Sequence, residues 1–194
     1  MVALQPAPFT TASPALVNFD SQEIANGTAY EDYFLIESED SGGKDYHLTP
    51  NPDFSNSATI SLNQATFDQD FDLTPFVLPR TINGTVLISI PISNQAAATS
   101  TTTVELYKWD GSSETQLGST VFVAKALSAA AMVYIRMPIV NKLIPAGEQL
   151  RVRVIYANPS NTTALMGIDP ANRADGTLTI TTQSKISIPY DPQN

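Results

Sequence analysis

The sequence predicts an all-β fold: a single antiparallel β-sandwich or jelly roll, preceded by an extended N-terminal arm. Short segments of alternating apolar and polar residues recur along the 194-residue chain, separated by turns that contain glycine or proline. These segments do not alternate with helices, as the strands of a parallel sheet would. The one stretch of helix-like composition, residues 124–132, is expected to form one or two turns in a connection.

Residues 1–20 are expected to form the arm, and residues 21–194 the single jelly-roll domain. Pro6, Pro8 and Pro14 each fix φ near about −65° and leave no run for a helix or a paired strand. The same prolines interrupt any apolar segment, and no basic segment precedes them, so we expect no secretory signal. Cysteine is absent, which excludes a disulfide framework and a thiolate nucleophile.

About ten strands are expected from the pattern. In 84–92, Val86, Ile88, Ile90 and Ile92 alternate with Leu87, Ser89 and Pro91, and Pro91 predicts a strand end or a sheet edge because it cannot donate to a ladder. Asp110-Gly111 predicts a hairpin. The expected strands are 33–37, 58–62, 66–73, 84–92, 102–110, 115–123, 132–138, 148–156, 176–182 and 184–190.

Charge and composition exclude several classes of function. The net charge is −9, which argues against direct binding of a nucleic-acid backbone. His47 is the only histidine, so a multi-histidine metal centre is excluded and a catalytic triad would depend on it. The chain contains no Gly-x-Ser-x-Gly elbow and no glycine-rich nucleotide loop. We therefore expect no enzyme activity, no catalytic residues and no cofactor, although a glycosidase with two converging acids stays an alternative.

Asp68, Asp70 and Asp72 form the most metal-like pattern in the sequence. Their spacing resembles the start of a calcium loop, but Leu73 and Pro79 stand where an EF-hand needs glycine and glutamate. On a strand the three aspartates would share one face, opposite Phe67 and Phe71. The pattern favours an amphipathic strand, and a calcium site shared with a loop or a neighbouring subunit is the alternative.

Arg151 and Arg153 are candidates for a subunit contact. The turn at 145–147 leads into a strand whose buried row is expected to contain Leu150, Val152 and Val154, which leaves the two arginines on the opposite face. Residues 1–79 hold twelve acids and one base, whereas residues 80–194 hold nine bases and seven acids. The arginines are thus the best place for the acidic first half to dock, in the same chain or in the next subunit; a solvated strand face is the alternative.

The order of these features resembles the single jelly-roll capsid proteins of icosahedral viruses. The likeness rests on a proline-containing arm, the segments "FDLTPFVLP" and "GTVLISIPI", a hairpin around "KWDGSSETQLG" and the strand "IPAGEQLRVRVIY". Within that group, acidic and lysine-poor subunits resemble the vertical single jelly-roll proteins of haloarchaeal, internal-membrane-containing viruses and their thermophilic phage relatives.

The resemblance implies a virion structural protein, made in the host cytoplasm and located in the capsid. Its partners would be copies of itself and other capsid proteins, with an underlying membrane vesicle reached through those proteins. A capsid decoration or cement protein is one alternative. A non-viral carbohydrate-binding or adhesin-like β-sandwich module is another, and Trp/Tyr platforms and a secretion signal would distinguish it.

Overall fold

The computed structural model describes residues 29–40, 43–53, 57–62, 66–94, 99–126, 130–157, 164–173, 178 and 180–191. The predicted arm at 1–20 lies outside these residues. The described residues form twelve strands: β1 (Ala29–Asp40), β2 (Gly43–Thr49), β3 (Thr59–Ser61), β4 (Thr66–Asp72), β5 (Arg80–Asn94), β6 (Thr99–Trp109), β7 (Glu114–Gln116), β8 (Val121–Ala126), β9 (Ala131–Ile144), β10 (Gln149–Ala157), β11 (Ala164–Gly167) and β12 (Lys185–Tyr190).

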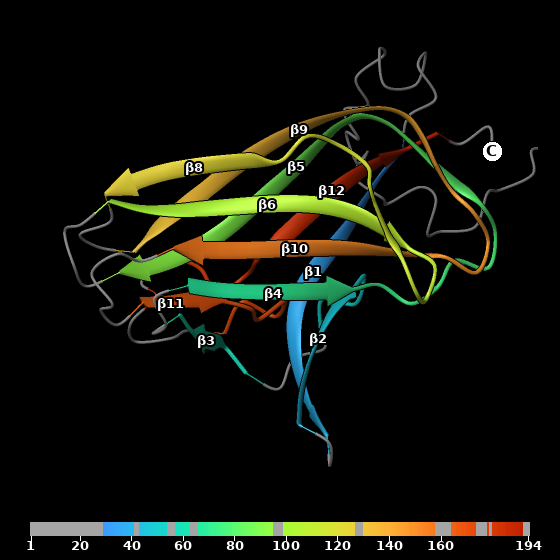
Figure 1. Ribbon diagram of the computed structural model, residues 1–194. Coiled ribbons are helices and arrows are strands. Elements are labelled where there is room, and N and C mark those ends of the chain that lie inside the picture. The colour runs from blue at the N-terminus through green and yellow to red at the C-terminus, as the bar shows by residue number, and fades with distance from the viewer. Residues whose placement is uncertain are drawn as a thin grey trace, which may run out of the picture.

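The strands lie in two facing layers, which confirms the predicted all-β sandwich (Figure 1). One layer has the order β9–β5–β12–β1–β2, and β5 also pairs with β11, which pairs with β3. The other has the order β8–β6–β10–β4, with β7 beside β8 on the same edge of β6. The pairing is antiparallel throughout, except for one parallel bridge between His47 of β2 and Asp72 of β4, which joins the two layers at one side.

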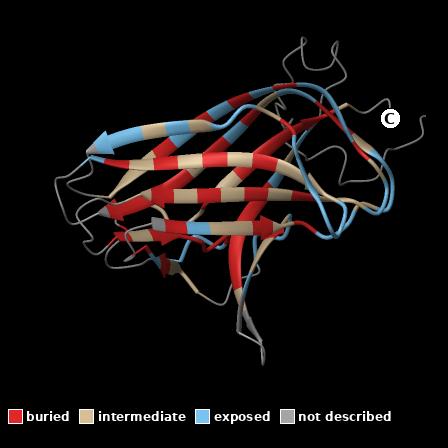
Figure 2. Ribbon diagram, viewed as in Figure 1, coloured by how far each residue is buried: buried red, intermediate tan, exposed pale blue. Residues whose placement is uncertain are grey.

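Alternating side chains fill the space between the layers. Along β10 the residues Leu150, Val152, Val154 and Tyr156 are fully buried, as predicted, and the intervening residues are partly exposed. Figure 2 shows the same alternation along β6 and β10. Because each buried aliphatic side chain contributes about 1.5–3 kcal/mol, a period of two over many strands is sufficient to specify which face of each strand points inward.

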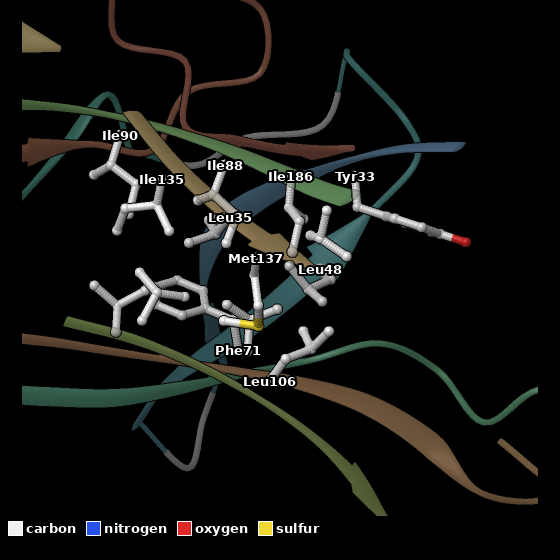
Figure 3. Close-up of a cluster of buried hydrophobic side chains, with 14 of the residues drawn as sticks. Tyr33, Leu35, Leu48, Phe71, Ile88, Ile90, Leu106, Ile135, Met137 and Ile186 are labelled. Carbon is white, nitrogen blue, oxygen red and sulfur yellow. The ribbon is translucent and has the colours of Figure 1, made fainter. Parts of the chain in front are cut away.

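Both layers contribute to one core. Figure 3 shows Leu35, Ile88, Ile135 and Ile186 of the first layer above Phe71 and Leu106 of the second. Met137 of β9 points into the space between the layers and is fully buried. Tyr46 packs edge-on against Phe71, with 5.4 Å between the ring centroids.

Several local predictions were wrong. Ala124–Ala126 belong to β8 and Ala131–Met132 to β9, so these parts of the predicted helical turn are extended. Pairing with β6 and β5 overrides the weak helical preference of alanine there. A strand was predicted at 176–182, but residues 178 and 180–182 lie outside the strands. Conversely, the sequence pattern did not predict β2 and β11.

Pro91 is not at a strand end, since β5 continues to Asn94. On one side of β5 the strand β9 runs past it, pairing Pro91 with Met132. On the other side, pairing with β12 ends at Ser89 and pairing with β11 begins at Ile92. Proline is therefore tolerated in a long strand because it lies where one neighbouring strand gives way to another.

The described residues include no helix of the length and hydrophobicity needed to cross a bilayer.

Candidate functional site

A network of acids, arginines and aromatic rings covers the outer surface of the second layer. The register places Asp72 of β4 opposite Arg151 of β10 and Asp70 opposite Arg153. On the other side of β10, β6 places Tyr107 opposite Arg151 and Glu105 opposite Arg153. The short strand β7 adds Glu114, which pairs with Trp109. We call this surface the charged face; its members are Asp68, Asp70, Asp72, Glu105, Tyr107, Trp109, Glu114, Arg151 and Arg153.

Arg151 is held on three sides. Its Nε and Nη2 donate to the two carboxylate oxygens of Asp72, at 2.6 and 2.7 Å, which is a bidentate pair. Its Nη1 lies 2.5 Å from Oε1 of Glu114. The guanidinium also lies 4.3 Å from the centre of the Trp109 ring. The hydrogen bond to Asp72 is the main cause that raises the pKa of Arg151 above its usual value.

Arg153 repeats the arrangement two residues further along β10. Its Nε donates to Asp70 at 2.7 Å and its Nη2 donates to the second Asp70 oxygen at 3.1 Å. Nη2 also lies 3.3 Å from Glu114, and the guanidinium lies 5.2 Å from the Tyr107 ring centre. Glu114 therefore bridges both arginines, which reduces the repulsion between two like charges on one strand face.

Tyr107 extends the network to β6. Its hydroxyl donates to Oε2 of Glu105 at 2.7 Å, and Thr120 donates to the other oxygen of the same carboxylate at 2.7 Å. Burial, followed by the hydrogen bond to Glu105, raises the pKa of Tyr107 to about 12. The aromatic rings of this face therefore already have partners, because cations lie over Tyr107 and Trp109.

These contacts locate both groups of predicted residues. Asp68, Asp70 and Asp72 lie on the solvent side of β4 and Phe67 and Phe71 on the core side, so the amphipathic strand is confirmed. Both oxygens of Asp70 and Asp72 accept from guanidinium groups, and no group of three acids or histidines in the described part of the chain is placed to hold a metal. The arginines dock on acids of their own chain; a subunit contact through them stays a prediction.

Sequence reasoning missed Glu114 and the two rings. The hairpin predicted at Asp110-Gly111 was the signal that could have found Glu114, since it returns the chain beside Trp109. Asp110 builds that turn: its carboxylate accepts from the backbone N–H groups of Ser112 and Ser113, at 2.8 and 2.7 Å. These hydrogen bonds lower the pKa of Asp110.

His47 lies in a hollow of about 500 Å³ where β2 meets β4. The neighbouring acid is Asp72, whose two oxygens are already engaged by Arg151. The nearby Thr49 hydroxyl accepts from the backbone N–H of Asn51 at 3.1 Å. The hollow contains no serine, and its polar lining residues are His47, Thr49, Asp72, Thr74 and Gln149. An imidazole and a carboxylate are thus adjacent here, but both oxygens of the carboxylate accept hydrogen bonds from Arg151.

Asp169 is a fully buried acid, and its role is local. Its carboxylate accepts from the backbone N–H groups of Ala171 and Arg173, at 3.1 and 2.8 Å, and from the Arg173 side chain at 2.8 Å. Burial alone would raise its pKa, but these hydrogen bonds outweigh burial and the pKa is lowered. Asp169 therefore stabilises its own turn, and its oxygens face that turn.

The outer surface of the first layer is different in character. Large apolar side chains are exposed there, among them Tyr30 at 41%, Leu87 at 40%, Tyr134 at 70% and Val140 at 71%. They come from β1, β5 and β9, and the Tyr30 hydroxyl donates to the backbone oxygen of Thr85 at 3.1 Å. We call these four residues and the strands that carry them the apolar face. A hollow of about 470 Å³ lies on it, lined by Leu87, Tyr134, Arg136, Lys185 and Ser187 among others.

Comparison by sequence finds no matching protein-family model and no matching curated protein. Solved structures do match. An α-amino acid ester hydrolase aligns with a TM-score of 0.59 at 12% identity, over 82% of this chain and 36% of its own. An aminopeptidase from a marine sediment Thaumarchaeota archaeon gives 0.61 at 10% identity, over 84% and 37%. A CocE/NonD family hydrolase from Staphylococcus aureus gives 0.54 at 13% identity, over 84% and 37%.

These matches correct the predicted function. The capsid prediction, its keywords and the expectation of no enzyme are contradicted, because hydrolase chains share this fold with TM-scores above 0.5. The error has a physical cause: strand order and an acidic composition are properties of a fold and a surface, and neither determines function. A chain of infectious bursal disease virus reaches a TM-score of only 0.27, which carries no argument.

The resemblance to single jelly-roll capsid proteins, the predicted partners and the virion location stay predictions without support of their own. At 10–13% identity the matches show the fold alone. This chain spans little more than a third of the length of each of the hydrolase chains that it resembles.

Proposed function

We propose that this chain is a β-sandwich domain of a hydrolase, which works beside a catalytic domain and does not supply the reacting groups itself. One observation carries the proposal: the fold covers 82–84% of this chain but only 36–37% of three hydrolase chains. In those chains the remaining length lies outside the match. A sandwich that forms part of an enzyme can orient or enclose a substrate site without contributing a nucleophile.

The charged face and the His47 hollow support the accessory role. Asp72, which lies beside His47, and Asp70 on β4 both accept hydrogen bonds from arginines. A carboxylate whose two oxygens are both engaged by a guanidinium has its hydrogen-bonding directions occupied by that partner. The described residues therefore present structural ion pairs where a catalytic chain would present a free base.

The test compares the recombinant chain with the native species that contains it. Residues 1–194 are assayed with amino-acid p-nitrophenyl esters and p-nitroanilides, and an antibody to the same residues isolates the native species from its source cells. We expect hydrolysis by the native species and only background hydrolysis by the recombinant chain. A native species without hydrolytic activity would overturn the proposal. Turnover by the recombinant chain that is lost in His47→Ala would show instead that this chain is itself catalytic.

A further inference from the structure

The hollow on the apolar face is surrounded by cross-strand neighbours from β5, β9 and β12. Leu87 of β5 lies opposite Arg136 of β9 on one side and Ser187 of β12 on the other. Ser89 lies opposite Tyr134 and Lys185 in the same way. Residues opposite each other in an antiparallel pair point to the same side, so these side chains surround one hollow of about 470 Å³. Aromatic residues and arginine around an apolar centre are the composition that protein interfaces favour.

The edge of β9 is protected against pairing with another strand. In the described residues β9 pairs only with β5, so its other side is an edge. That edge carries the exposed Pro138, which cannot donate to a new ladder. The register with β5 shifts beside Asn141, whose φ of 47° bends the strand. A partner is therefore expected on the face of this sheet and not along its edge.

Charge indicates what kind of partner would fit. The charged face holds five acids and two arginines, a net charge of 2 − 5 = −3, and its arginines are all paired. Around the hollow on the apolar face, Arg136 and Lys185 line the wall and Asp32 lies opposite Ser187, so these three residues carry a net charge of 2 − 1 = +1 in a chain of net charge −9. Lys185 pairs with Asp32 at 3.0 Å, but no ion pair joins Arg136 to a residue that the structure describes. An apolar surface with acidic side chains at its rim is complementary to this arrangement.

We propose that the apolar face, centred on Leu87, Tyr134 and Arg136, is the surface on which the catalytic domain of the hydrolase docks. The inference rests on the proposed function, and it names the contact that function requires. The catalytic domain would place apolar side chains over Tyr134 and Leu87 and a carboxylate against Arg136. This contact would exclude water from a ring that is 70% exposed in the chain alone.

Hydroxyl-radical footprinting tests the proposal without any substitution. Tyr134 of β9 and Phe122 of β8 form a matched pair, since they are 70% and 66% exposed and lie on different layers of the sandwich. The oxidation rate of each ring is measured by mass spectrometry in recombinant 1–194 and in the antibody-isolated native species. We expect Tyr134 to be oxidised at least roughly threefold more slowly in the native species, and Phe122 at an unchanged rate, because the core of an interface excludes water.

The outcomes separate the two proposals. Unprotected Tyr134 in a native species that hydrolyses esters or anilides would overturn the docking face and leave the proposed function standing. Protection of Phe122 in place of Tyr134 would have the same meaning. Protection of Tyr134 in a species without hydrolytic activity would overturn the catalytic domain as the occupant, together with the proposed function.

Discussion

The two outer faces of the sandwich are built with the same strand geometry, but their side chains differ in whether they find partners within the chain. On the charged face, each arginine of β10 is paired with an aspartate of β4, and Glu114 links the two pairs. On the apolar face, Arg136 has no ion pair with a described residue, and Tyr134 and Val140 are exposed. The charged face pairs its arginines within the chain, whereas the apolar face leaves apolar side chains exposed to water and one arginine without an ion pair to a described residue. The difference predicts that substitutions on the first affect stability and those on the second affect association.

Among substitutions on the two outer faces, the largest effect is expected from Arg151→Ala. The substitution removes two charge-assisted hydrogen bonds to Asp72 and the contact with Trp109, and it leaves Asp72 without its bidentate partner and Glu114 with Arg153 alone. We expect the free energy of unfolding to fall by about 2–3 kcal/mol. Urea denaturation at neutral pH measures it. Arg136→Ala on the apolar face is the matched control, with an expected change below about 0.5 kcal/mol. Equal losses in the two variants would contradict the comparison.

A double-mutant cycle compares one ion pair from each face. For Arg153 and Asp70, which are bidentate and partly buried, we expect a coupling free energy of about 1 kcal/mol. For Lys185 and Asp32, whose side chains are 35% and 48% exposed, solvent screening should reduce it to about 0–0.5 kcal/mol. Chemical denaturation of the four variants in each cycle gives both values. A larger coupling free energy for the exposed pair, Lys185 and Asp32, would show that partial burial does not strengthen the ion pair on the charged face.

Deprotonation of Tyr107 at alkaline pH gives a smaller effect on the charged face. Tyr107 has a pKa of about 12 in the folded chain and about 10 when unfolded, so the unfolded state loses its proton first as pH rises. Stability from the protonated Tyr107 is complete below about pH 10 and is lost towards pH 12. Between these limits the wild type should lose stability relative to Tyr107→Phe, by less than about 1 kcal/mol because the ring is partly exposed. If the wild type and Tyr107→Phe lost stability equally over this pH range, burial of Tyr107 and its hydrogen bond to Glu105 could not be the cause of the loss.

The smallest effect on stability is expected on the apolar face. Tyr134→Ser and Leu87→Thr remove apolar area that water already contacts, so the free energy of unfolding should change by less than about 0.5 kcal/mol. Denaturation curves check this, with Ile135→Ala as a control from the buried side of the same strand. That control should cost about 2–5 kcal/mol. A large loss in Tyr134→Ser would mean that the ring stabilises the fold and is not reserved for a partner.

Much of the fold could be predicted because the inward face of a strand is a local property. Leu150, Val152 and Val154 alternate with polar residues, and burial follows from that period alone. The partner of each strand is not local. Arg151 and Asp72 lie 79 positions apart, and only the order β4–β10–β6 brings them together. Alternation therefore placed the arginines on the outer face but left open whether they met acids of the same chain.

The apolar face could have been predicted from the outward-facing residues of the same strands. In β9, Val133, Ile135 and Met137 form the buried row, which leaves Tyr134 and Arg136 outside. An aromatic ring and an arginine on the outer row of a strand indicate a contact surface. Function could not be predicted in this way, because the strand pattern that resembled capsid subunits belongs equally to a part of several hydrolases.

Carbodiimide cross-linking of the native species tests the docking of a catalytic domain most directly. The reagent joins a lysine to a carboxylate that contacts it, and in the recombinant chain the Lys185–Asp32 pair, at 3.0 Å, provides an internal standard. In the native species we predict new cross-links from Lys185 on the apolar face to acidic residues of a hydrolase sequence outside residues 1–194. Lys125 of β8, on the other layer of the sandwich, should form no such cross-links. Cross-links to a hydrolase from Lys125 but not from Lys185 would contradict the assignment of the two faces.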